Sequence, residues 1–196
     1  MATNPGSEFK SSGITENTPK TIMLGAGTIH KGLTFSGTAW NAEESLICAT
    51  SGGAKLSIVP EFYDIPVDGA LVKVKGLTAK VGETATLEIN PIEMTPEILK
   101  MSTIGNASAS STATGYQEIT SRAHIEEGDY IENLGYVGKT IEGKPVIIIF
   151  DYALCTSGLE LEGKNKEAAV PSFTFECMAD LSPEADTLPW HIYYLA

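Results

Sequence analysis

The residues of this chain that could carry out chemistry are three histidines, three cysteines and several clustered carboxylates. His30, His124 and His191 lie far apart and form no HExxH or other paired motif, so their spacing indicates no local metal site. A thiol beside a histidine could act as a nucleophile, yet no family-specific signature surrounds Cys155 or Cys177. Only convergence in space would create a metal centre or a nucleophilic pair from these residues.

A second candidate is the acidic cluster of Glu126, Glu127 and Asp129 around Gly128. Paired carboxylates can serve as acid and base when burial drives their pKa values apart. The glycine and the density of charge favour a solvated turn instead. We therefore expect that the chain is not an enzyme and that it needs no cofactor and no metal ion.

Two other patterns resemble ligand sites in composition only. Asp64 and Asp68 could ligate calcium, but an EF-hand needs further acids at alternating positions and a distal glutamate, so a simple turn is favoured. The stretch Gly25-Ala26-Gly27 lacks the GxGxxG spacing and a following lysine–threonine pair. We expect it to link two strands and not to bind a nucleotide.

Length and composition favour one β-rich domain as the scaffold for these residues. A chain of 196 residues with 42% hydrophobic residues has enough material for a single core. Its 19 glycines and 10 prolines, spread between short apolar runs, indicate many turns and favour β-structure over a helical bundle. No apolar run approaches the roughly 20 residues that cross a bilayer, and the N-terminus lacks a signal-peptide pattern. We expect a chain that neither spans a membrane nor enters the Sec pathway.

Residues 1–20 are expected to form a flexible arm before a single β domain over residues 21–196. Within this arm, Gly6-Ser7-Glu8-Phe9 has the form of a cloning scar, and a native disordered arm fits equally well. Cys48, Cys155 and Cys177 form no CxxC pair and leave an odd thiol. They suit a reducing cytoplasm and predict buried free thiols.

Alternation of apolar and polar residues predicts most of the strands. In the clearest case, Val81, Glu83, Ala85, Leu87 and Ile89 share one face of a half-buried strand, with Glu83 expected at its end. The run 146–150 predicts a central strand buried on both faces and opened by a proline, after a hairpin turn at residues 142–143. Further strands are expected over residues 22–24, 28–35, 56–63, 118–125, 133–137, 145–154, 159–162 and 173–178.

Only one helix is expected. Thr95 can cap it, Pro96 suits its first position, Glu97 complements its dipole, and Gly105 would end it. Ile98, Leu99 and Met101 would then face a sheet. Residues 107–114 contain too few large apolar groups to pack, so we expect a mobile loop. The pattern predicts a mainly β fold of two packed antiparallel sheets, as a β-sandwich or partly open barrel, with one flanking helix.

The net charge of −12 is unevenly placed along the chain. Residues 1–105 carry 8 lysines against 11 acids, which gives −3, and residues 106–196 carry 5 cations against 14 acids, which gives −9. Arg122 is the only arginine, whereas phosphate clamps and base readout rely on arginine and on clustered positive charge. This composition disfavours tight nucleic-acid binding.

One segment joins two strand-like runs through an acidic, glycine-containing turn, namely 61–70 (EFYDIPVDGA) followed by Val74-Lys75-Gly76. The stretch 49–53 precedes its first strand, a strand-like run follows at 143–149, and Pro189-Trp190-His191-Ile192-Tyr193 closes the chain. In this order and spacing, the segments resemble the tail tube (major tail) proteins of long-tailed bacteriophages, particularly those of Gram-positive hosts. The resemblance spans residues 24–195, while residues 1–20 and 106–115 depart from the pattern.

The resemblance implies a structural virion protein with a helix-flanked β-sandwich, assembled in the host cytoplasm into stacked hexameric rings of a tail tube. Its partners would be further copies of the chain, the tape measure and terminator proteins, and genomic DNA passing through the lumen without tight binding; no membrane partner is implied. A contractile tail or a related injection device is a close variant. Stacking is expected on residues 36–45 and on the N-terminal arm, with Trp40, Asn41, Glu43, Glu44, Asp64 and Asp68 as assembly residues.

Two alternatives stay open at this stage. An acidic wall would keep DNA from sticking to the tube, but ordinary solubility also explains the charge. A ligand-binding β-sandwich of the carbohydrate-binding or adhesin type would use Trp40, Tyr116, Tyr130 or Tyr136 as stacking platforms and would be a monomer stabilised by its ligand. Trp40 itself either contacts another subunit or folds back on its own core.

Overall fold

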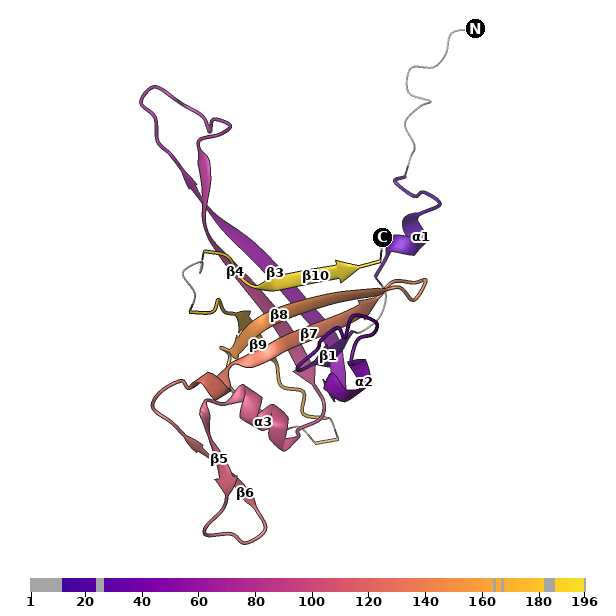
Figure 1. Cartoon of the computed structure of the whole chain (residues 1–196), viewed down its shortest axis with the longest axis vertical. Helices are drawn as coiled ribbons and strands as arrows, with labels where there is room; N and C mark the ends of the chain where they lie inside the picture. Colours follow the sequence, from indigo (N-terminus) through magenta and orange to yellow (C-terminus); the bar gives the residue numbers. More distant parts are fainter. Residues whose placement is uncertain (1–11, 24–26, 164, 167, 182–185, 196) are drawn as a thin grey trace.

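The computed structural model describes residues 12–23, 27–163, 165–166, 168–181 and 186–195 (Figure 1). Most of the predicted N-terminal arm, including residues 6–9, and Gly25 and Ala26 of the predicted link lie outside this part of the chain. The helices are α1 (Thr18–Thr21), α2 (Ala42–Ser45), α3 (Pro96–Ser102) and the 3-10 turn η1 (Glu127–Asp129). The strands are β1 (Thr28–His30), β2 (Leu46–Cys48), β3 (Thr50–Asp64), β4 (Thr78–Pro91), β5 (Gly105–Ala109), β6 (Gln117–Ser121), β7 (Ile131–Lys139), β8 (Pro145–Cys155), β9 (Phe173–Cys177) and β10 (Trp190–Tyr194).

The main sheet divides at β8. One edge of β8 pairs with β7 from Pro145 to Ala153. The opposite edge pairs first with β10, along 146–150, and then with β9, along 153–155. The strand order along the main path is β2-β1-β7-β8-β9-β4-β3, all antiparallel, with β10 as a side branch. The described strands do not close into a barrel.

The larger hydrophobic core is built from both branches of this forked sheet. Trp190 of β10 and Ile98 of α3 pack against the same cluster as the strands. The prediction of a mainly β, sandwich-like fold with one flanking helix is therefore confirmed, and its two antiparallel sheets are this forked sheet and the separate pair β5–β6. The buried side chains from β4, β8 and β9 in this cluster are Ala85, Leu87, Ile89, Ile148, Phe150, Ala153, Cys155, Phe173, Phe175 and Cys177.

β8 is buried on both faces, as its β-branched run predicts. Ile148 and Phe150 belong to the main core, while Ile147 and Ile149 form a second cluster with Leu33 on the opposite face. The turn before β8 is the predicted hairpin: the Gly143 amide donates to the Thr140 carbonyl at 2.8 Å, and Gly143 has a φ of +81°. Glycine adopts this left-handed conformation without steric cost.

The predicted helix is confirmed as α3, although it is shorter than expected. The Thr95 hydroxyl accepts a hydrogen bond from the Ile98 amide at 3.3 Å, and Ile98 is buried. The helix ends at Ser102 and not at Gly105, because Thr103 is already extended. The Ser102 and Thr103 hydroxyls both donate to the Leu99 carbonyl, which satisfies an acceptor of the last turn.

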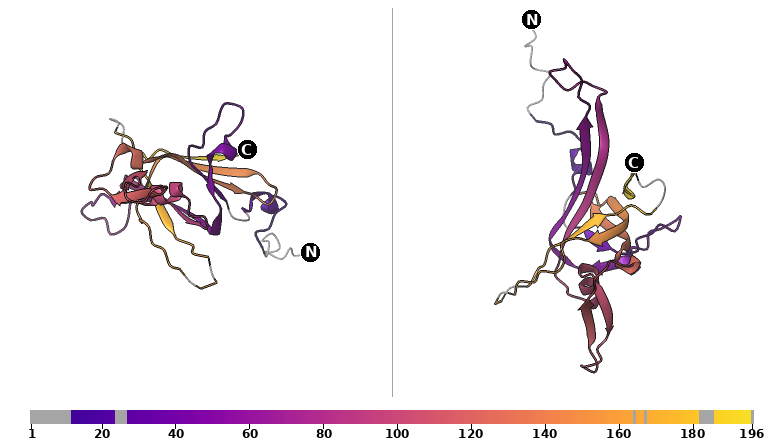
Figure 2. Two further views of the ribbon diagram at one scale, coloured as in Figure 1. Left: turned by 90° about the horizontal axis from the view of Figure 1, so that it is seen from below. Right: turned by 90° about the vertical axis from the view of Figure 1, so that its left-hand side faces the viewer.

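Two hairpins project from the body at opposite ends (Figures 1 and 2). The β3–β4 arm comprises the outer halves of β3 and β4 with the connecting residues 65–77. The β5–β6 arm comprises β5, β6 and the turn over residues 110–116. The expectation of a loop over residues 107–114 is wrong for 107–109, which pair with 117–119. Backbone pairing, which needs no large side chain, orders this segment.

Other expected strands are shorter or absent. The strand expected over residues 28–35 ends at His30, because Gly32 turns the chain with a φ of +69°. The strand expected over 118–125 ends at Ser121, and residues 159–162 form no strand. Of the strand expected over 22–24, Met23 makes a single bridge to Thr140. Beyond the assigned strands, the described residues of the first and last of these segments make only isolated bridges or single backbone hydrogen bonds, such as that from the Leu33 amide to the Asn133 carbonyl.

Candidate assembly surface

The β3–β4 arm begins where β9 stops pairing with β4, so that only β3 and β4 continue as a pair. β4 pairs with β9 only over Thr86–Ile89, whereas the pairing of β3 with β4 continues outward to Asp64 and Thr78. The outer arm is therefore a two-stranded ribbon with both edges unpaired by any described strand. Such a ribbon is marginally stable by itself in water. The ribbon projects far from the rest of the molecule (Figure 2).

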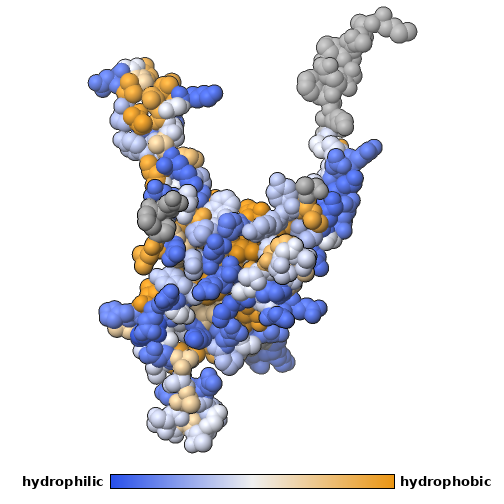
Figure 3. All heavy atoms as spheres, viewed as in Figure 1, coloured by the Kyte–Doolittle hydropathy of each residue, from blue (hydrophilic) through white to orange (hydrophobic). Residues whose placement is uncertain are grey.

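The apolar face of β3 continues beyond the point where the body covers it. Leu56 and Ile58 pack against the core. Alternation along the strand puts Pro60 and Phe62 on the same face, and Phe62 is 64% exposed. Val59 and Tyr63, on the opposite face, are also exposed. Apolar side chains accordingly gather towards the end of the arm (Figure 3).

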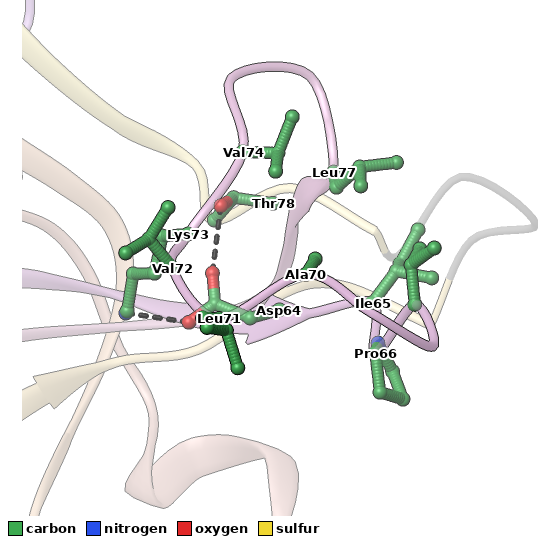
Figure 4. A pocket seen from close by; sticks show the side chains of 11 residues that line it. Asp64, Ile65, Pro66, Ala70, Leu71, Val72, Lys73, Val74, Leu77 and Thr78 are labelled. Atoms are coloured by element: carbon green, nitrogen blue, oxygen red, sulfur yellow. Dashed lines mark hydrogen bonds and ion pairs between the residues drawn. The ribbon is translucent and has the colours of Figure 1, made fainter.

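The loop at the tip of the arm is closed by backbone and ionic contacts (Figure 4). The Ile65 amide donates to the Leu77 carbonyl at 2.8 Å. Asp64 Oδ2 pairs with Lys73 Nζ at 2.5 Å, and the Thr78 hydroxyl donates to Asp64 Oδ1 at 2.7 Å. The hydrogen bonds from Lys73 and Thr78, with the charge of Lys73, lower the pKa of Asp64 below its ordinary value. These contacts hold the loop as a defined shape.

The closed loop presents apolar side chains outward. Leu71 is 98% exposed and Val72 is 77% exposed. The loop encloses a concavity of about 300 Å³. Contiguous exposed apolar surface of this kind marks sites of interaction with other molecules. The apolar residues that line the concavity are Ile65, Pro66, Val67, Ala70, Leu71, Val72, Val74 and Leu77.

The root of the arm carries a charged residue on its apolar face. Glu83 lies inside β4 and not at a strand end, which corrects the sequence-based expectation. The carboxylate is tolerated there because the Trp190 indole donates to Glu83 Oε2 at 3.0 Å and Lys80 Nζ lies 2.8 Å from Oε1. The hydrogen bonds from Lys80 and then Trp190 lower the pKa of Glu83. The contact joins the arm to β10.

Val81 leaves the apolar face on which it was expected. The pairing steps from Glu61–Gly82 to Phe62–Lys80, so Val81 is an extra residue on β4. Such a bulge redirects side chains and increases the local twist of the strand. The exposure of Val81 follows from this bulge.

The predicted assembly residues fall into two separate groups. Asp64 and Asp68 lie on the β3–β4 arm, where Asp64 closes the tip loop and Asp68 precedes Gly69 in an exposed turn. The other four lie in or beside α2, against the body (Figure 1). The structure does not bring the two groups together. The group at α2 comprises Trp40, Asn41, Glu43 and Glu44.

Trp40 folds back on its own domain. Its ring lies 5.2 Å from that of Phe35 and 5.2 Å from that of Tyr193, and it packs on the second cluster. Asn41 has a local role, because its side chain accepts from the Thr34 amide at 2.8 Å and donates to the Gly32 carbonyl at 2.9 Å. Glu43 and Glu44 are exposed in the first turn of α2.

Aromatic residues near the C-terminal strand line a shallow cavity of about 370 Å³. Its walls include Phe35, Trp40 and Tyr193. Tyr116, Tyr130 and Tyr136, the other candidate platforms, do not line it. Tyr136 packs against the main core, and Tyr116 is exposed in the turn at the tip of the β5–β6 arm.

The histidines and cysteines have structural surroundings. His30 is buried, with Nδ1 hydrogen-bonded to the Ser45 hydroxyl at 2.9 Å and Nε2 to the Thr28 hydroxyl at 2.8 Å. Desolvation lowers the pKa of His30. All three cysteines are buried free thiols. Burial, with the charges of Asp151 and Glu83, raises the pKa of Cys177 to about 12, so this thiol is protonated at neutral pH.

Neither a metal cluster nor a membrane-spanning helix is found in the described part of the chain. No group of three or more histidine, cysteine, aspartate or glutamate side chains is placed to hold a metal ion there. None of the described helices has the length and hydropathy needed to cross a bilayer.

The sequence does not reveal the part played by Arg122. Asp129 is not fully solvated, as a turn residue would be, because the Arg122 guanidinium pairs with it and the Glu126 amide donates to Asp129 Oδ2 at 2.8 Å. Glu126 Oε2 lies 3.0 Å from Arg122 Nη1. Glu126 and Asp129 follow Arg122 by four and seven residues. This spacing would predict ion pairs only if the segment were helical, and it is not.

We compared the sequence with protein-family models and with curated proteins, and neither comparison identifies a relative. No protein-family model matches the chain, and no curated protein matches it.

Proposed function

We propose that the chain is a structural subunit that self-assembles, in the manner of phage tail tube proteins, into stacked rings that form a conduit for DNA. The observation that carries this proposal is the β3–β4 arm, whose tip exposes Leu71 and Val72 to solvent. Burying a side chain of this size contributes about 1.5–3 kcal/mol. The arm therefore gains stability when its tip packs against another copy.

The remaining surface supplies a second kind of contact. β2 and β3 end the main sheet, so each leaves one edge unpaired by any described strand. Unpaired edges are templates for pairing with another chain. Contacts between different surfaces of identical copies close into rings when the rotation between copies allows it. Edge contacts would form the ring, and the arm would reach a neighbouring ring.

The charge of the chain is compatible with a conduit for DNA. The net charge of −12 disfavours adhesion of phosphates to the wall. Arg122, the one arginine, is engaged with Asp129 and Glu126 and is not free to bind a phosphate. In this proposal the partners are further copies, the tape measure and terminator proteins and the passing DNA, and the site of action is a virion tail.

The role of the arm is tested by replacing its exposed leucine, Leu71. Leu71→Asp is compared with Leu181→Asp, which changes a leucine that is 104% exposed outside the arm. Sedimentation velocity over a wide concentration range measures the mass of each variant. The wild type and Leu181→Asp should form assemblies larger than a monomer, and Leu71→Asp should shift the association midpoint at least tenfold towards higher concentration. Equal behaviour of all three proteins would refute a role for the arm.

The aromatic cavity favours a second candidate function, a ligand-binding module. The apolar C–H faces of sugar rings stack on tryptophan and tyrosine rings, and Trp40 and Tyr193 both line this cavity. Under this alternative the protein is a monomer, and oligosaccharides raise its melting temperature and change the fluorescence of Trp40. Trp40→Ala would abolish both responses. A panel of neutral oligosaccharides that leaves both unchanged would dismiss the alternative.

A further inference from the structure

The β5–β6 arm has few apolar contacts that could fix its direction. Neither of its strands pairs with the main sheet. After Gly105, the residues of β5 are exposed, and its side chains are small. The arm is connected to α3 through Thr103 and Ile104, and to η1 through the segment after β6. Regions with little buried apolar surface are those that open at low cost in free energy.

A cavity separates the base of this arm from the end of β8. Its volume is about 600 Å³. Ile119 lines it from the arm and Ile104 from the connection between the arm and α3, while Cys155 and Leu159 line it from the body. Side chains do not fill the space between these groups, so the arm has room to move towards the end of β8. Packing at this position does not hold the arm.

Among the residues that the structure describes, the Arg122 guanidinium makes the polar link between the arm and the body. Arg122 Nε donates to the His124 carbonyl at 2.9 Å. Nη1 donates to Asn106 Oδ1 of β5 at 3.1 Å and lies 3.0 Å from Glu126 Oε2. Nη2 pairs with Asp129 Oδ2 of η1. One side chain thus connects the first strand of the arm with the turn that leads into β7.

The two carboxylates that contact Arg122 differ in burial. The side chains of Arg122 and Asp129 are 14% and 10% exposed, whereas that of Glu126 is mostly exposed. Salt screens a largely buried pair much less than an exposed one. Exposed ion pairs contribute little to stability. Asp129 is therefore the principal partner, and it is held in place by the Glu126 amide.

We propose that Arg122 and Asp129 form an ionic latch that sets the direction of the β5–β6 arm, and that the arm swings as a unit towards the cavity when the latch opens. The pairing of β5 with β6 and the hydrogen bond from the Ser110 amide to the Tyr116 carbonyl do not involve the latch. The ribbon therefore persists while its direction changes. This conformational device does not depend on the proposed function.

Single-molecule FRET on the full chain tests the latch at concentrations too low for assembly. Dyes are attached through Ser111→Cys at the arm tip and Glu142→Cys at the β7–β8 turn, both exposed, while the three native thiols are buried. With the latch intact, we expect one narrow distribution of transfer efficiency. Asp129→Asn should widen it or add a second population. Glu126→Gln, the same change on the exposed partner of Arg122, should leave it narrow.

The outcomes separate a latch from a merely structural contact. An unchanged distribution in Asp129→Asn would overturn the proposal, and so would an equal effect of Glu126→Gln. Near-UV circular dichroism establishes that each variant is folded. If Asp129→Asn does not fold, Arg122→Gln replaces it, because this variant keeps the hydrogen bond from the Glu126 amide to Asp129. A narrow, unshifted distribution in folded Arg122→Gln would equally overturn the latch.

Discussion

The two arms of this protein are both antiparallel hairpins, but they are anchored by different interactions. The β3–β4 arm extends strands of the main sheet, and its apolar face is continuous with the core. The β5–β6 arm has no strand in common with that sheet and is tied to the body through Arg122. Packing against the core sets the direction of the β3–β4 arm, whereas a few polar contacts set the direction of the β5–β6 arm. We therefore expect mutations in the core to destabilise the β3–β4 arm, and mutations of the polar contacts to change the direction of the β5–β6 arm.

The surfaces of the two arms differ as well. The β3–β4 arm exposes Phe62, Leu71 and Val72, and its pairing is interrupted by the bulge at Val81. Apart from Tyr116 in its turn, the β5–β6 arm exposes small and polar side chains, and its pairing has no irregularity. Bulges hinder edge-to-edge pairing, while exposed apolar side chains favour burial. The first arm is suited to contacts through side chains at its tip.

The largest expected effect lies at the root of the β3–β4 arm. Leu87→Ala removes a buried side chain of β4 from the main core and should lower the free energy of unfolding by about 2–5 kcal/mol. Ser108→Ala, an exposed change in the β5–β6 arm, should alter it by less than about 0.5 kcal/mol. Urea denaturation measures both. Comparable losses of unfolding free energy in the two variants would contradict the view that the two arms are anchored by different interactions.

The root of the β5–β6 arm has no room for a side chain at Gly105. A Cβ on Gly105 would lie 2.5 Å from the Thr120 carbonyl oxygen, a backbone atom that cannot rotate away. Gly105→Ala should therefore destabilise the protein by about 1–3 kcal/mol. Gly128→Ala is the matched control, because a Cβ there meets open space. Thermal unfolding compares the two, and equal melting temperatures would contradict the close contact of β5 with β6.

The contact between Trp190 and Glu83 predicts a dependence on pH. The folded-state pKa of Glu83 is lowered from 4.5, so its stabilising contribution is present above pH 4.5 and is lost as the pH falls through the lower folded value. Trp190→Phe removes one cause of the shift and should make the loss of stability in acid shallower. Trp40→Phe, the same truncation on the second cluster, should leave the slope unchanged. Parallel curves for all three proteins would contradict the assignment.

The smallest effect is expected at the tip of the β3–β4 arm. Asp64→Asn weakens the contact with Lys73, an exposed ion pair, so the global melting temperature should hardly change. Backbone hydrogen exchange should still become faster at Ile65, whose amide bonds to Leu77. Asp68→Asn, in the exposed turn of the same loop, provides the control. Unchanged exchange at Ile65 would show that the ion pair does not close the loop.

The sequence predicted the parts of the fold that depend on local patterns. The apolar run of β8, the cap at Thr95 and the turn at Gly143 each contain their signal within a few residues. β6 was predicted as part of the strand expected over residues 118–125, whereas β5 escaped prediction because its small residues pair through the backbone and leave no hydrophobic period. Glu83 was misplaced because the partner that makes its position tolerable, Trp190, is 107 residues away.

The candidate site was predicted only in part. The acidic turn at Asp64 and Asp68 was singled out, and the structure places it at the end of a long arm. The apolar character of the tip can be read from Leu71 and Val72 in the sequence. Their exposure could not be predicted, because it depends on how far β3 and β4 extend beyond the rest of the domain. Trp40 was a candidate contact residue, and its neighbours Phe35 and Tyr193 instead hold it against the domain.

The most direct test of self-assembly is electron microscopy of the concentrated full-length protein, combined with light scattering for the mass in solution. We predict rings or hollow tubes with sixfold symmetry, together with a mass that rises with concentration. A mass that stays at the 20.8 kDa of one chain over the whole concentration range, with no rings or tubes in the images, would contradict the proposed function.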